Sequence, residues 1–204
     1  ASAGTSNFRA GVNAGNSIQS GGNYNTVVGD EAGTAITTAD GNVAVGKSAL
    51  SATTTGAENT AVGLSSLLLN TTGTQNVGFG SSTLDACTEG SYNTAIGTSA
   101  LGGVTTADYN TAVGRNAGAA VTTGTQNTLI GGLAGDALTT ANNNVAVGYS
   151  ALSADLKGDR NTAIGTETLA AQQFGTATNS YNTAVGYHAG NDVTTGTNNT
   201  LIGG

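Results

Sequence analysis

The 204-residue chain has no proline, methionine or tryptophan, and it contains one cysteine and one histidine. Only 8% of the residues are charged and 4% are aromatic, and the formal net charge is -7. The five basic residues are too few for a nucleic-acid or anionic-lipid surface, because neutralising phosphates requires clustered Lys and Arg. No apolar run approaches the roughly 18 residues of a membrane-spanning helix. Cys87, being alone, cannot form an internal disulfide.

Glycine is abundant, with 33 residues, and a pentapeptide motif close to N-T-A-V-G recurs through the chain. The motif begins at Asn7, Asn25, Asn42, Asn59, Asn76, Asn93, Asn110, Asn127, Asn144, Asn161, Asn182 and Asn199. Nearly all of these positions are 17 residues apart, and the longest interval contains a four-residue insertion near 174–178. Self-similarity at a short fixed period predicts a solenoid, here a single repeat domain over residues 1–204.

We number the positions of each coil 1 to 17 from the motif asparagine. Positions 2 to 4 alternate branched and small residues, which predicts a strand with two unlike faces. The fixed glycines and the Thr-Thr pairs disfavour helix. Seventeen residues leave room for two short strands and two turns, with coils in parallel register about 4.8 Å apart. We therefore predict an all-β parallel β-solenoid of about twelve coils.

Each motif residue has an expected role. The asparagines at position 1 should form a hydrogen-bonded ladder, and the glycines at position 5 should occupy a turn where a side chain would clash. We expect the Thr and Val side chains at positions 2 and 4 to fill the core, and Ala at position 3 to admit a neighbouring chain. The predicted structural positions are Asn25, Asn42, Asn59, Asn76, Asn93, Asn110, Asn127, Asn144 and Asn161 with Gly29, Gly46, Gly63, Gly97 and Gly114.

Positions 9 and 12 vary together. Where position 9 is Gly, as at Gly33, position 12 is large and apolar, as at Ile36. Where position 9 is Leu, position 12 is mostly small, polar or Cys, as at Leu84 and Cys87. Close packing explains this pattern if one core slot is filled from either side. Nearly all charged residues lie outside the motif, so we expect charge only in turns and on the outward face.

Residues with catalytic chemistry are few and dispersed. His188 is a lone histidine in a turn, and no second ligand stands at metal-ligand spacing. Cys87 falls in the core slot and is expected to be a buried, inert thiol. Asp30-Glu31 and the pair Asp155 and Asp159 lie in different kinds of turn, without a cleft of the sort that a glycosidase needs. We predict no catalytic, metal or cofactor site and no enzymatic activity.

The tyrosines are the candidate surface contacts. Tyr24, Tyr92, Tyr109 and Tyr181 occupy position 17, and Tyr149 and Tyr187 occupy position 6, the latter beside His188. They are interpreted either as amphipathic residues covering a turn or as contacts with a neighbouring chain or a sugar. Two sequons, at Asn70 and Asn198, match the N-glycosylation pattern.

The motifs "NVAVG" at Asn42 and "YNTAVGYHAG" at Tyr181 carry a resemblance to two kinds of fibre. The chain resembles the repeats of bacteriophage tail-fibre proteins and is similar to the head-domain repeats of trimeric autotransporter adhesins. The resemblance implies left-handed parallel β-rolls assembled into a homotrimeric fibre, on a virion or cell surface.

The sequence suggests four candidate functions. The first is a rigid structural and adhesive fibre segment that positions or mediates host attachment, with copies of itself and a surface glycan or protein as partners. A self-assembling extracellular filament or surface adhesin is the second, since both chain ends fall within a coil and copies could stack end to end. The third is ice binding through threonine pairs such as Thr37-Thr38, although Thr88-Glu89 interrupts the array. An enzyme is the fourth. No cofactor, nucleic acid or membrane insertion is expected.

Overall fold

The computed structural model describes residues 4–204, and residues 1–3 of the predicted repeat domain lie outside the described range. Its strands are β1 (Phe8–Ala10), β2 (Thr26–Val28), β3 (Val43–Val45), β4 (Thr60–Val62), β5 (Val77–Phe79), β6 (Thr94–Ile96), β7 (Thr111–Val113), β8 (Thr128–Ile130), β9 (Val145–Val147), β10 (Gly158–Asp159), β11 (Thr162–Ile164), β12 (Thr178–Asn179), β13 (Thr183–Val185) and β14 (Thr200–Ile202). Twelve form one parallel sheet in chain order, and β10 pairs with β12 separately.

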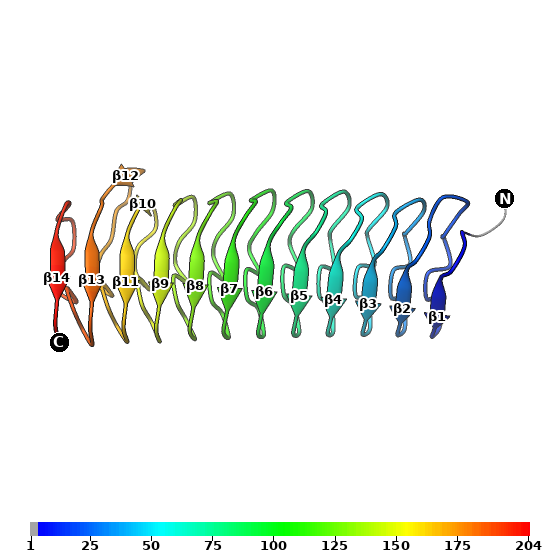
Figure 1. Ribbon diagram of the computed structural model, residues 1–204, viewed down its shortest axis with the longest axis horizontal. Helices are drawn as coiled ribbons and strands as arrows, with labels where there is room; N and C mark the ends of the chain where they lie inside the picture. Colours follow the sequence, from blue (N-terminus) through cyan, green and yellow to red (C-terminus); the bar gives the residue numbers. More distant parts are fainter. Residues whose placement is uncertain (1–3) are drawn as a thin grey trace.

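Successive coils stack side by side along a rod, with β1 and β14 at its opposite ends (Figure 1). The register joins equal coil positions: Thr94 pairs with Thr111, and Ala95 pairs with Ala112. The prediction of an all-β parallel β-solenoid with a 17-residue spacing is therefore confirmed.

The expectation of two strands in each coil is wrong. From β2 to β9 each coil contributes one three-residue strand, and the remainder is a series of turns. Positions 7, 9 and 17 are left-handed, as shown by Ser99, Leu101 and Tyr109 with φ of 56°, 50° and 60°. Left-handed residues redirect the chain sharply, so the coil closes without a second strand.

The two faces of the strand are the reverse of the expectation. Position 3 is the buried one, with Ala95 and Ala112 fully buried, whereas Ile96 at position 4 is 40% exposed. The interior of the coil is narrow, and position 9 already supplies a large fully buried side chain such as Leu101 in many coils. Close packing then leaves room for only a methyl group opposite it, so the branched residues face outward.

The shared core slot extends to position 3. A Cβ on Gly118 would lie 2.7 Å from Leu129 Cδ1 and 3.4 Å from Val121 Cγ2. A Cβ on Gly33 would lie 2.7 Å from both Ile36 Cδ1 and Val27 Cγ1. Position 3 carries a large residue, Val27 or Leu129, where position 9 is Gly in adjoining coils. The volume removed at position 9 is thus replaced from positions 3 and 12.

Asparagines at position 1 form a continuous ladder within the core. The Asn110 side-chain oxygen accepts hydrogen bonds from Asn127 N and Nδ2, both at 3.0 Å. Asn110 Nδ2 donates to the Gly124 carbonyl at 2.8 Å, which ties the start of the coil to its end. Equivalent bonds join Asn42 to Asn59 and Asn76 to Asn93. The position-5 glycines stack so closely that a Cβ on Gly114 would lie 2.5 Å from the Gly131 carbonyl oxygen.

The coil that carries the four-residue insertion includes β12, which pairs with β10 of the preceding coil and projects from one long edge of the rod in Figure 1. Asp155 is fully buried at the base of this pair, so the expectation of charge only on the surface is wrong here. Its carboxylate accepts hydrogen bonds from Gly158 N at 3.1 Å, from Phe174 N at 3.0 Å and from Gln172 Nε2 at 2.6 Å. These hydrogen bonds offset the cost of removing a polar side chain from water.

Candidate functional site

The outward side chains at positions 2 and 4 make a long uncharged surface, mostly of Thr at position 2 and of Val, Ile or Phe at position 4, which we call the sheet strip. Its most exposed large members are Ile202 at 72% and Phe8 at 60% in the two end coils and Phe79 at 56% between them. Ile96, Ile130 and Ile164 are 39–40% exposed, and the intervening valines are half-buried. All come from the 12-stranded sheet, so the strip runs along the rod. A row of exposed large apolar side chains along one face is typical of an interaction site.

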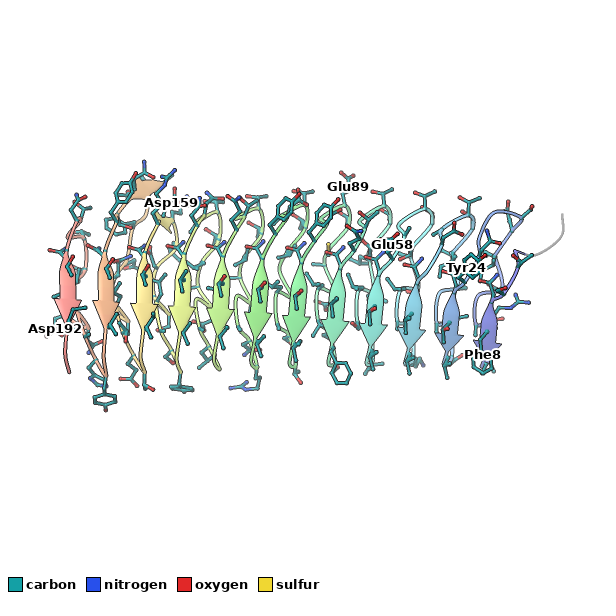
Figure 2. All side chains as sticks on the ribbon, in the orientation of Figure 1. Phe8, Tyr24, Glu58, Glu89, Asp159 and Asp192 are labelled. Carbon is teal, nitrogen blue, oxygen red and sulfur yellow. The ribbon has the colours of Figure 1, made fainter. Side chains whose placement is uncertain are left out.

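The residues at positions 16 and 17, which we call the rim, line a second surface. Position 16 forms its own hydrogen-bonded column, in which a side-chain oxygen accepts from the main-chain N–H of the preceding coil. Ser91 N donates to Asp108 at 2.7 Å, and Thr125 N donates to Asn142 at 2.9 Å. Ala57 interrupts this column because it has no side-chain oxygen. Glu58 and Glu89 lie toward the edge of the rod opposite Phe8 (Figure 2).

Aromatic side chains of the rim stack along the rod axis. The Tyr92 and Tyr109 rings are parallel, with centroids 4.8 Å apart and an interplanar angle of 2°. Arg160 lies over the Tyr181 ring, 5.6 Å from its centroid. These positions are exposed, so the predicted surface placement of Tyr92, Tyr109 and Tyr181 is what the structure shows.

A recess of about 230 Å³ opens in the rim beside the interruption at Ala57. Its lining consists of Ala57, Glu58, Thr74, Gln75 and Tyr92. Gln75 Nε2 donates to Glu58 Oε2 at 2.6 Å, so two of the polar side chains hold one another in place. The sequence reasoning missed Glu58 and Gln75, and the break in the position-16 polar column was the signal that could have found them.

The tyrosines at position 6 lie in a different turn from the rim. Tyr149 and Tyr187 are exposed, and the Tyr187 ring stacks on His188 with centroids 4.0 Å apart. His188 Nε2 lies 2.8 Å from Glu167 Oε2. The candidate surface contacts are therefore divided between two turns, with Tyr92, Tyr109 and Tyr181 in one and Tyr149, Tyr187 and His188 in the other.

The remaining candidates are structural. Cys87 is fully buried, and burial raises the pKa of its thiol to about 11. Asn70 is also fully buried, which hides its sequon, whereas Asn198 is exposed. Within residues 4–204 no cluster of three or more His, Cys, Asp or Glu side chains has an arrangement that could bind a metal ion. Across the same range, no helix has the length and apolarity to span a membrane.

The threonines at position 13 use their hydroxyl groups within the solenoid. Thr105 Oγ1 donates to the Thr122 carbonyl at 3.3 Å, and Thr122 Oγ1 donates to the Thr139 carbonyl at 3.2 Å. The neighbouring position 14 is exposed but carries Glu89 and Lys157 among its threonines. The first threonine of each such pair therefore uses its hydroxyl group to join neighbouring coils.

No family model, curated protein or solved structure matches this chain at a significant level.

Proposed function

We propose that the chain is a non-enzymatic structural and adhesive fibre segment that works outside the cell, as in a phage tail-fibre shaft or a surface adhesin. Three side-chain columns, at positions 1, 13 and 16, reinforce the backbone bonds between coils. A rod joined this way resists bending and can present binding surfaces at a distance. The motif resemblance stated above points to the same role.

The observation that carries the proposal is the sheet strip. Twelve strands spaced about 4.8 Å apart and about 10 Å long give a projected area near 600 Å² per chain. Two such faces in contact would bury about 1,200 Å², the lower end of the range for specific interfaces. A homotrimer with three strips turned toward a common axis would cover it. The strip carries Thr, Val, Ile and Phe, so like faces can meet without charge repulsion.

Sedimentation equilibrium of the chain tests the assembly. We expect the wild type to form a trimer, and the double variant Val62→Glu/Val113→Glu to remain monomeric because two charges per chain would be buried in the interface. The matched control is Thr72→Glu/Thr123→Glu, which places the same charges at exposed position 14 of the same coils. A wild type that stays monomeric at high concentration, or a strip variant that associates normally, would contradict the proposal.

The second candidate is a self-assembling filament, which the stacking of equal coil positions favours. Open-ended association that grows with concentration, in place of a fixed stoichiometry, would identify it. Ice binding has less support, because the position-13 hydroxyls are donated to the next coil. A thermal-hysteresis measurement tests that function directly.

A further inference from the structure

The recess at Ala57, Glu58, Thr74, Gln75 and Tyr92 has the chemistry of a small polar binding site. It lies where the position-16 column carries Ala57 in place of a side chain with an oxygen, and its lining comes from three successive coils. Those coils span about 10 Å along the rod, on the spacing of neighbouring strands. The length is similar to that of one or two linked sugar rings.

The Tyr92 ring borders the recess at its end toward the later coils. Tyr109 stacks on the face directed toward the later coils, with 4.8 Å between the centroids. The other residues that line the recess all belong to earlier coils. The recess must therefore adjoin the opposite face of Tyr92, which is suited to packing against the apolar face of a flat, saturated ring.

The same lining includes polar groups that are suited to hydroxyl recognition. The Glu58–Gln75 hydrogen bond uses Oε2, and Oε1 is an acceptor for a ligand hydroxyl. The Gln75 side-chain carbonyl and the Thr74 hydroxyl oxygen add two acceptors, since the Thr74 hydroxyl donates its proton to Ser91 Oγ at 3.5 Å. Because Gln75 fixes Glu58 and Tyr109 fixes Tyr92, little side-chain freedom is lost when a ligand binds.

We propose that this recess binds a neutral carbohydrate, with the sugar ring packed on Tyr92 and its hydroxyls hydrogen-bonded to Glu58 and Gln75. The inference rests on the proposed adhesive function and names the class of its ligand. Glu58 is the one charged residue of the lining, and the chain has a net charge of -7, so anionic sugars are disfavoured. A shallow site of this size should bind weakly, with Kd on the order of 1 mM, and a trimer would gain from multivalency.

Saturation-transfer NMR with a panel of neutral disaccharides, and with sialic acid and a sugar phosphate as anionic comparators, tests the site. We expect transfer to the apolar face of at least one neutral sugar, and loss of affinity by about tenfold or more in Tyr92→Ala and Glu58→Gln. Tyr24→Ala and Glu89→Gln are matched controls at exposed sites outside the recess and should bind like the wild type.

A third variant, Gln75→Tyr, fills the recess with a ring and also removes the Gln75 amide that bonds to Glu58. Tyrosine is common at position 17, so a ring there should extend the Tyr92–Tyr109 stack, cover the side of Tyr92 that borders the recess and abolish binding in a folded protein. Normal binding by Gln75→Tyr, tighter binding of the anionic sugars, or no neutral sugar bound would overturn the inference. Sedimentation of the same samples separates the two proposals: normal trimers without sugar binding contradict only the recess, and sugar-binding monomers contradict only the assembly.

Discussion

Replacing one asparagine of the core ladder should destabilise the solenoid strongly. Asn110→Ala removes the acceptor of Asn127 N and the donor to the Gly124 carbonyl, which lie 3.0 Å and 2.8 Å from the Asn110 side chain. Asn110 is fully buried, so water cannot readily take its place. Each buried main-chain group left unpaired costs about 1–3 kcal/mol, and the pair therefore costs about 2–6 kcal/mol. That is a large fraction of the 5–15 kcal/mol typical of a folded domain.

Urea unfolding followed by circular dichroism measures the effect. We expect a lower midpoint with an unchanged slope, since the variant should bury the same surface when folded. Hydrogen exchange should show the loss of protection concentrated in the coils beginning at Asn93, Asn110 and Asn127, because solenoid coils interact with their nearest neighbours. Thr123→Ala, an exposed position of the same coil, should change stability by less than about 0.5 kcal/mol. A loss for Asn110→Ala no larger than that of the control would refute the reasoning.

Three further outcomes follow from the core and the half-buried carboxylates. Gly118→Ala should lower stability by about 1–3 kcal/mol in the same urea experiment, because its Cβ would lie 2.7 Å from Leu129 Cδ1 in a close-packed slot. Cys87 should react with a thiol reagent only after unfolding, since burial raises its thiol pKa to about 11; fast labelling of the folded chain near pH 8 would disprove this. Desolvation raises the pKa of Asp136 in the folded state, so the contribution of Asp136 to stability is lost as pH rises through that pKa. Asp136→Ala should therefore stabilise the chain more at about pH 7 than at about pH 3. Equal effects of the substitution at the two pH values would contradict the assignment.

The repeat period and the parallel register could be predicted from the sequence because the same residue types recur once in every coil. Asn at position 1 is constant because each asparagine hydrogen-bonds to the asparagine of the next coil, and Gly at position 5 is constant because a Cβ would clash with the glycine of the next coil. The orientation of the strand could not be obtained the same way. Alternation shows that two faces differ, but it does not show which face is inside, and Thr or Val usually marks the buried side.

The decisive quantity was the width of the interior, which depends on the left-handed turns at positions 7, 9 and 17. Non-glycine residues adopt left-handed φ only rarely, so the identities of Leu101 and Tyr109 did not indicate their left-handed conformation. Once those turns bring position 9 close to the strand, Leu101 fills the space and only alanine fits opposite. The single strand per coil and the outward-facing sheet strip both follow from this one geometric fact.

In such a rod, the residues that depart from the repeat distinguish one coil from another. In an in-register stack each side chain contacts the same position in the coils before and after it, so one change alters two contacts. Ala57 breaks the position-16 column and opens the recess beside Glu58, and Asp155 replaces a core residue at the base of the insertion. The constant positions make the rod and cannot distinguish one partner from another. Any selectivity along the rim must therefore come from coils where a column is interrupted, and Ala57 is where that search should begin.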